Sequence, residues 1–153
     1  MKKSLFRLIL LVLNSGTLPL SASVEIPADD PNIQYYGRWD FSDPLAPSHS
    51  WPGVYIHARF EGSSIGVRMA DNFCYYNIII DGIHHAVLHP TAATVTTYML
   101  ATGLADSVHT IRIEKRNETT WTRFSFHGFV LDDGKALQPP ERALQRRIEF
   151  VGD

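Results

Sequence analysis

The side chains with the widest chemical repertoire in this sequence are seven histidines, which could bind a metal ion or transfer protons. His57, His109 and His127 fall in separate segments, whereas His84 and His85 are adjacent. Adjacent residues of a strand point to opposite faces, so this pair cannot easily bind one ion together. No zinc-type ligand spacing accompanies the histidines. The sequence therefore predicts no transition-metal site and no cofactor.

The only cysteine, Cys74, lies in the apolar segment FCYYNIII. Nothing in the local sequence marks an activating partner for a catalytic thiol, so we interpret Cys74 as a small buried hydrophobic residue. With a single cysteine the chain cannot form an internal disulfide, even in an oxidising compartment.

Aromatic residues suggest a second kind of chemistry, because sugar rings can stack their C–H faces on flat aromatic planes. The candidates for carbohydrate contact are Trp51, Trp39 and Tyr36. Trp51 is expected to be exposed, since SHSWPG resembles a loop that enters a strand. The alternative is core or interdomain packing, which is the commoner use of aromatic residues in strands.

Four acidic residues, Asp29, Asp30, Asp40 and Asp43, fall in loops near expected strand ends. Loop carboxylates can bind calcium, but we expect these residues to cap turns instead. Asn117 begins the segment NET, which fits the acceptor pattern for N-glycosylation. We expect Asn117 to serve its turn as well.

These residues must be positioned by β-strands, because alternation with a period of two dominates from Ile33 onward. The segments VYIHARF, SIGVRM and HTIRIEK alternate apolar and polar residues. In TRFSFHGFV, Phe124, Phe126 and Val130 are expected to share one face. Asp81–Gly82 predicts a tight hairpin, because both central positions of such a turn favour left-handed backbone.

About eight strands with short links, and no convincing amphipathic helix, predict an all-β fold. The expected architecture is an antiparallel β-sandwich of the jelly-roll type over residues 33–137. The segment before residue 33 is polar and contains prolines, so we expect it to precede the sandwich as a lead-in.

The N-terminus has a different organisation. MKKSLFR is basic, LILLVLNSGTLPL is a short apolar run, and SASVE offers small residues for cleavage. This layout predicts a secretory signal peptide over residues 1–23, with an uncleaved membrane anchor as the alternative. Loss of its basic side chains would leave a chain more acidic than the net charge of −2. We therefore expect a secreted or periplasmic monomer with no nucleic-acid partner and, after cleavage, no membrane contact.

The character of the chain changes again after residue 137. The segment LQPPERALQ is polar and contains two adjacent prolines, which predicts a linker over residues 138–146. The apolar residues Ile148, Phe150 and Val151 then bunch together. This bunching is typical of a strand in a doubly covered parallel sheet, so residues 147–153 are expected to begin a second, α/β domain.

Five segments in order resemble motifs of carbohydrate esterase family 2: YYGRWDFSDPLAPSHSWPGVYIHARFEGSSIGVRM, NIIIDG, HTIRIEKRNE, FHGFVLDDG and RRIEFVGD. The resemblance implies an N-terminal jelly roll joined to an esterase domain of the SGNH, or GDSL, type. Such acetylxylan esterase-like enzymes remove acetyl groups from plant polysaccharides such as xylan and glucomannan. Gly152 and Asp153 match the first two positions of the family's Gly-Asp-Ser block, and the nucleophilic serine would follow them.

The resemblance therefore implies that this chain holds no catalytic residue, because the serine, the histidine base and most oxyanion donors would lie further on. Its implied role is non-catalytic: supporting an esterase domain, its expected partner, and sharing in holding acetylated plant polysaccharide. Two alternatives stay open, namely a free-standing carbohydrate-binding module and a cell-surface interaction domain without a sugar ligand.

Overall fold

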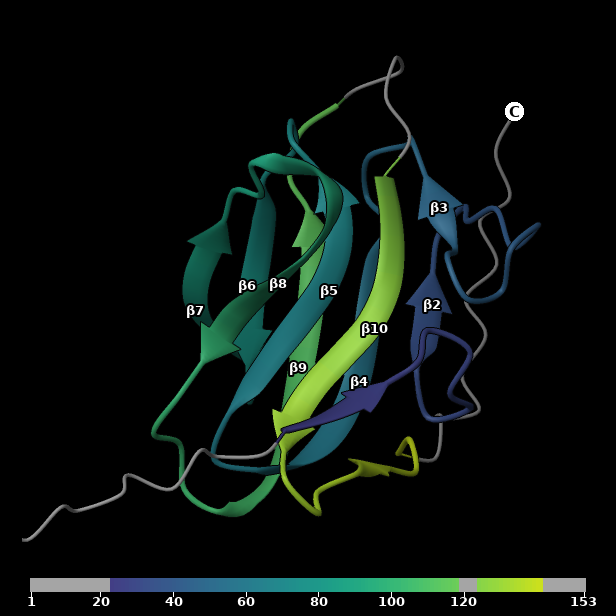
Figure 1. Cartoon of the computed structure of the whole chain (residues 1–153). Helices are drawn as coiled ribbons and strands as arrows, with labels where there is room; N and C mark the ends of the chain where they lie inside the picture. Colours follow the sequence, from purple (N-terminus) through teal and green to yellow (C-terminus); the bar gives the residue numbers. More distant parts are fainter. Residues whose placement is uncertain (1–22, 119–123, 142–153) are drawn as a thin grey trace, which may run out of the picture.

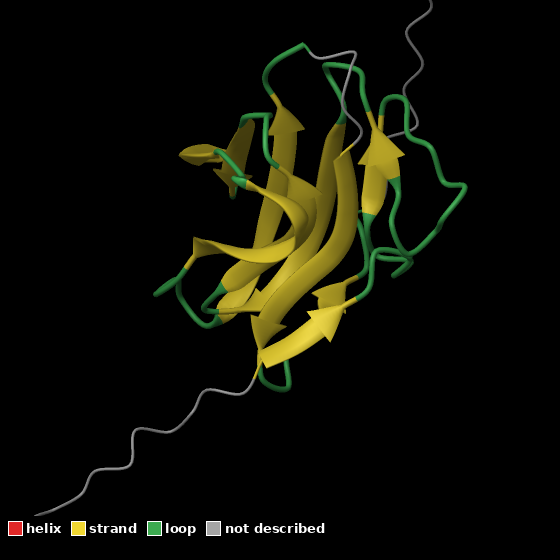
Figure 2. Cartoon of the chain, turned by 45° about the horizontal axis from the view of Figure 1, so that its top comes forward, coloured by secondary structure: helices red, strands yellow, loops and turns green. Residues whose placement is uncertain are grey.

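The computed structural model describes residues 23–118 and 124–141, which form two antiparallel sheets packed face to face (Figure 1). The described part of the chain contains strands and loops but no helix (Figure 2), and so no helix that could cross a membrane. The predicted all-β sandwich is confirmed. Its strands are β1 (Ser23–Ile26), β2 (Gln34–Tyr36), β3 (Ser48–His49), β4 (Tyr55–Gly62), β5 (Ile65–Asp71), β6 (Tyr76–Ile80), β7 (Ile83–Leu88), β8 (Ala92–Ala101), β9 (Ser107–Lys115), β10 (Phe124–Asp132) and β11 (Leu137–Gln138).

The two sheets interleave strands from distant parts of the sequence. One sheet has the order β1-β10-β5-β8, with β3 also paired to β10. The other has the order β11-β4-β9-β6-β7, with β2 also paired to β4. In Figure 1, β10 and β5 of the first sheet lie in front of β4 and β9 of the second. The core fills the space between these sheets.

Strand alternation selects the core residues, as predicted. Along β4, Ile56, Ala58 and Phe60 are buried, and the residues between them point away from the core. The segments SIGVRM and HTIRIEK follow the same rule. Cys74 is fully buried, which confirms its interpretation as a small hydrophobic residue. The turn at Asp81–Gly82 is also confirmed, because both residues have positive φ, of 51° and 77°.

Strand β10 departs from the predicted alternation. Phe124 and Phe126 are buried as expected, but Phe129 enters the core while Val130 is only half-buried. The register between β10 and β5 shifts between Phe126 and Gly128. This bulge adds one residue to β10, so the side chains beyond it exchange faces. The prediction that Phe124, Phe126 and Val130 share one face was therefore wrong for Val130.

The N-terminal edge of the sandwich also differs from the prediction. The supposed lead-in contains β1, which pairs with β10 along its whole length, and both Ile26 and Ala28 are buried. A strand of four residues is too short for its alternation to be recognised in sequence. At the other end, Gln138 pairs with Arg59 and so belongs to the sandwich instead of the linker.

Several other predictions lie outside the described residues. These are the signal peptide up to residue 22, the linker beyond residue 141, and the strand at 147–153 with Gly152 and Asp153. They stay predictions.

Candidate functional site

A surface pocket of about 170 Å³ lies where β3 meets the loops on either side of it. One edge of β3 pairs with β10, and the other forms a bridge in which Asp40 N–H donates to Ser48 O at 2.8 Å and Ser48 N–H donates back at 2.9 Å. These bonds bring the loop before β3 and the loop after it to one place. The residues that line the pocket are Arg38, Trp39, Asp40, Ser48, His49, Ser50 and Trp51.

Trp51 forms the exposed wall of this pocket. Its side chain is 53% exposed, which confirms the predicted exposure. The guanidinium carbon of Arg38 lies 5.2 Å from the centroid of the Trp51 ring, a cation–π distance. The indole is thus partly held in place while much of its surface stays open. Contact between Trp51 and a sugar stays a prediction.

Trp39 forms a second wall but is largely committed to packing. Its ring meets Tyr35 and His49 edge-to-face, with centroids 5.0 and 4.6 Å apart, and its Nε1–H donates to Tyr36 O at 3.0 Å. Most of the contacts of Trp39 are therefore packing contacts, as the alternative interpretation expects. The part that faces the pocket remains available to a ligand.

Tyr36, the third candidate, does not line the pocket. Tyr35 and Tyr36 are neighbours in β2 and point to opposite faces, with Tyr35 packed against the core. Tyr36 is 39% exposed and stacks on Tyr55, with ring centroids 4.4 Å apart and an interplanar angle of 10°. The structure thus brings Trp39 and Trp51 together and places Tyr36 on the outward face of the β4 sheet.

The polar residues of the pocket were not predicted, and His49 is the most unusual of them. It is only 6% exposed, and its Nδ1 has no hydrogen-bond partner among the described residues. Burial, followed by the nearby Lys115 ammonium, lowers the pKa of His49 to about 3, so the ring is neutral at ordinary pH. In the sequence, the flanking residues Ser48 and Ser50 do not indicate that the side chain of His49 points inward. The strand that contains His49, β3, has only two residues.

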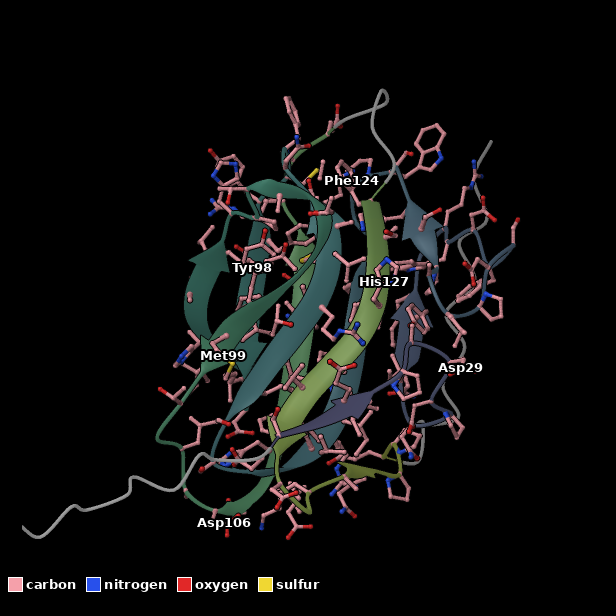
Figure 3. The ribbon with its side chains drawn as sticks, viewed as in Figure 1. Asp29, Tyr98, Met99, Asp106, Phe124 and His127 are labelled. Atoms are coloured by element: carbon pink, nitrogen blue, oxygen red, sulfur yellow. The ribbon has the colours of Figure 1, made fainter. Side chains whose placement is uncertain are left out.

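A buried lysine, Lys115, contacts the backbone of a residue that lines the pocket. Lys115 is 5% exposed, and its Nζ donates to Ser50 O at 2.6 Å. Nζ also lies 4.8 Å from the centroid of Phe124, which stands at the start of β10 beside β3 (Figure 3). Burial lowers the pKa of Lys115. The bond to Ser50 O fixes the backbone immediately before Trp51.

Acidification from pH 7 to about pH 5 is expected to remove about 2 kcal/mol from the free energy of unfolding through His49 alone. The pKa of His49 is about 3 in the fold and 6.5 in an ordinary environment, so in this range the unfolded chain binds a proton that the fold excludes. This contribution is present above pH 6.5 and is lost as the pH falls toward 3.

Urea unfolding of the wild type and of His49→Phe at pH 7 and pH 5 measures this contribution. The stability difference between the two proteins should change with pH, whereas the difference between the wild type and His84→Phe, on exposed β7, should change much less. If the stability difference between the wild type and His49→Phe were the same at both pH values, the lowered pKa of His49 would be contradicted.

A chain of Ser107, His109 and Asp81 has the residue types of a catalytic triad. His109 Nδ1 lies 2.7 Å from Asp81 Oδ2, and Ser107 Oγ lies 3.2 Å from His109 Nε2. However, Nε2 also lies 2.9 Å from Ala105 O. A carbonyl oxygen only accepts, so Nε2 must carry a proton there and cannot take one from Ser107. The bond to Asp81, then that to Ala105 O, raises the pKa of His109, which fits a structural ion pair.

The other polar predictions concern turns and metals. Side-chain oxygens of Asp30, Asp40 and Asp43 each accept a backbone N–H two residues on, which confirms turn capping for these three. Asn117 Oδ1 accepts the backbone N–H of Tyr75 at 2.9 Å, in the connection between β5 and β6, so its expected role in its own turn stays a prediction. Within residues 23–118 and 124–141, no group of three or more His, Cys, Asp or Glu residues is arranged to hold a metal ion.

Comparison with known protein families matches residues 35–140 to the carbohydrate esterase 2 N-terminal family. The chain is 37% identical over 128 residues to the cellulase/esterase CelE of Acetivibrio thermocellus, a match that covers 82% of this chain and 15% of the relative. It is 33% identical over 114 residues to an acetylxylan esterase / glucomannan deacetylase of Cellvibrio japonicus, covering 73% of this chain and 30% of the relative.

Solved structures give the same result. A family two carbohydrate esterase from Clostridium thermocellum, in complex with cellohexaose, matches with a TM-score of 0.67 and 33% identity. That match covers 79% of this chain and 37% of the other. A family two carbohydrate esterase from Cellvibrio japonicus has the same fold, with a TM-score of 0.70, over 83% of this chain and 38% of the other. The chain thus spans well under half the length of the proteins it matches.

Proposed function

Because the chain belongs to the carbohydrate esterase 2 N-terminal family, we propose that it is the non-catalytic N-terminal sandwich of a secreted polysaccharide O-acetylesterase. The observation that carries this proposal is the family match over residues 35–140, which takes in most of the sandwich. The matched relatives are much longer than this chain. The ester chemistry is assigned to the rest of a longer polypeptide, and export is supported by the basic and apolar pattern of the N-terminus.

The geometry of the described residues supports a non-catalytic role. Acyl transfer needs an activated hydroxyl, a base that can accept its proton, and donors aimed at the developing oxyanion. At Ser107 the base is blocked, because His109 Nε2 is bonded to Ala105 O. Among the described residues, Nδ1 of the buried His49 ring has no hydrogen-bond partner, and burial lowers the pKa of His49 to about 3, which makes the ring a weak base.

The pocket at Trp39 and Trp51 supports a share in holding the polysaccharide. Its volume of about 170 Å³ is below the range for drug-sized ligands, so it suits one sugar ring of a chain that continues outside. Trp51 offers a flat surface for the ring, while Arg38 offers a donor for hydroxyl groups. Acetylated xylan or glucomannan is the proposed ligand.

Trp51→Ala in the longer polypeptide is expected to raise the KM for polymeric acetylated xylan by about three- to tenfold, since one stacking contact contributes about 0.5–1.5 kcal/mol. The kcat for a small acetyl ester should not change, because such a substrate does not reach the pocket. Acetate release measures both values. Tyr75→Ala is the matched control, since Tyr75 is 44% exposed but lies outside the pocket.

Three outcomes separate the possibilities. An unchanged KM for Trp51→Ala would mean that the sandwich supports the esterase domain but does not hold the polysaccharide through Trp51. Failure of the longer polypeptide to release acetate would overturn the esterase assignment. In that case, slowed migration of the 153-residue chain in a gel containing xylan would favour a free-standing carbohydrate-binding module.

A further inference from the structure

We propose that the outward face of the β4 sheet is the surface on which the esterase domain of the same polypeptide docks. We call this surface the β4 face and define it by Tyr36, Tyr55, His57, Arg59 and Arg112. The inference rests on the proposed function, because it requires an esterase domain that follows the sandwich. It adds which surface of the sandwich that domain covers.

The path of the chain provides the first argument. The last strand of the described residues, β11, pairs with β4, so the polypeptide leaves the sandwich beside the β4 face. Arg59 Nη1–H donates to Pro139 O at 2.9 Å, and Gln138 Nε2–H donates to Glu61 Oε2 at 3.4 Å. These contacts hold residues 138–139 against outward side chains of β4. A domain that follows them therefore begins next to this face.

The β4 face is also flat and ordered at one end. Tyr36 and Tyr55 are cross-strand partners whose rings stack at 4.4 Å. The guanidinium of Arg112 lies 5.8 Å from the Tyr55 centroid, and its Nε–H donates to Glu114 Oε1 at 2.8 Å. Tyr and Arg are enriched in protein interfaces, and side chains that are already held in place lose less entropy on association.

A shallow depression adjoins this ordered surface. It has a volume of about 240 Å³ and is lined by His57, Ile79, Gly82, Thr110 and Arg112. Interfaces are commonly anchored by a side chain that enters such a hollow on the partner. Burial lowers the pKa of His57, so its ring is neutral at ordinary pH and adds no charge that docking would have to desolvate.

The β4 face meets the tryptophan pocket at one edge. Trp39 Nε1–H donates to Tyr36 O, so a wall of the pocket and the Tyr36–Tyr55 stack are joined by one hydrogen bond. A domain seated on the β4 face therefore stands beside Trp39, one wall of the pocket that also contains Trp51. A polysaccharide held at Trp51 would then extend directly toward the domain that deacetylates it.

Chemical modification of surface tyrosines tests this arrangement without any substitution. Tyr36 and Tyr75 form a matched pair, since they are 39% and 44% exposed and each is stacked on one neighbour, Tyr55 or His89. The 153-residue chain and the longer polypeptide are nitrated with tetranitromethane, and both sites are quantified by mass spectrometry. We expect Tyr36 to react at least about tenfold more slowly in the longer polypeptide, because an interface core excludes solvent, and Tyr75 to react equally in both.

Equal reactivity of Tyr36 in the two proteins would overturn the docking proposal. If acetate release by the longer polypeptide persists with Tyr36 accessible, the esterase assignment stands and only the docking surface is wrong. Protection of Tyr36 in the 153-residue chain by added xylo-oligosaccharide, with no protection in the longer polypeptide alone, would instead identify the β4 face as a sugar site and reject docking there.

Discussion

Gly128→Ala is expected to destabilise the sandwich by more than about 3 kcal/mol, enough to prevent folding of a marginally stable domain. Gly128 has a φ of +114°, a backbone conformation that residues with a Cβ rarely adopt. A Cβ at this position would lie 1.9 Å from Ile26 O and 3.0 Å from the Ile26 carbonyl carbon. Both atoms are backbone, so no side-chain rotation relieves the overlap.

The position of Gly128 explains why the substitution would also affect β1 and the core. It follows the register shift of β10, which is the central strand that joins β1 to β5. Ile26 is the last residue of β1 and pairs with Phe129. Relief of the overlap would push β1 away from β10 and expose part of the core that Phe129 fills.

Urea unfolding monitored by tryptophan fluorescence measures this effect, with Gly134→Ala as the matched control. Gly134 also has a positive φ, of 69°, but a Cβ there would meet nothing within 4 Å. Gly134→Ala should therefore lower the free energy of unfolding by only about 1–2 kcal/mol, which is the backbone cost of an alanine in the left-handed region. Similar losses for the two variants would show that the contact with Ile26 relaxes at little cost.

Asp71→Ala is expected to cost about 3–5 kcal/mol, because it leaves three donors, two of them buried, without an acceptor. Asp71 is 2% exposed. Its Oδ1 accepts the backbone N–H groups of Phe73 and Cys74 at 2.7 and 3.0 Å, and its Oδ2 accepts the Tyr76 hydroxyl at 2.7 Å. These bonds shape the connection between β5 and β6, which belong to different sheets.

Tyr76→Phe is the graded control, because it removes one of these bonds and leaves the carboxyl group in place. Burial, and then the Asp71 carboxyl, raises the pKa of Tyr76, so its hydroxyl remains a donor at all ordinary pH values. We expect a loss of about 1 kcal/mol in the free energy of unfolding, measured at pH 7. A loss for Asp71→Ala no larger than that for Tyr76→Phe would mean that the two N–H groups find other acceptors.

The outward and inward faces of three long strands were readable from the sequence. Alternation in β4, β5 and β9 predicted their core residues, because a pleated strand sends successive side chains to opposite sides wherever it is regular. The turn at Asp81–Gly82 was equally readable, since few residue pairs accept left-handed backbone in succession. The ordered motifs also predicted the family to which the chain belongs.

The bulge in β10 and the strand β1 were not readable in this way. A bulge depends on how β10 registers against its neighbours, and Gly128 looks like any other glycine until Ile26 is placed against it. Strand β1 is too short to show a pattern, and its burial follows from its pairing with β10. The bulge depends on contacts between segments about 60 residues apart and β1 on contacts about 100 residues apart, which local propensity does not encode.

The sequence by itself determined the residue types of the candidate site: aromatic side chains suited to sugar rings, in a chain whose motifs indicate an esterase family. Only the tertiary structure decided which of these side chains lie together. Pairing of β3 with Asp40 on one side and β10 on the other gathers Trp39, Trp51 and the buried His49 into one pocket. Neighbouring residues of β2 point to opposite faces, so Tyr36 points away from that pocket and lies on the β4 face. The physical reason is that a binding surface is made by strands far apart in sequence, whose register is set by packing between the two sheets.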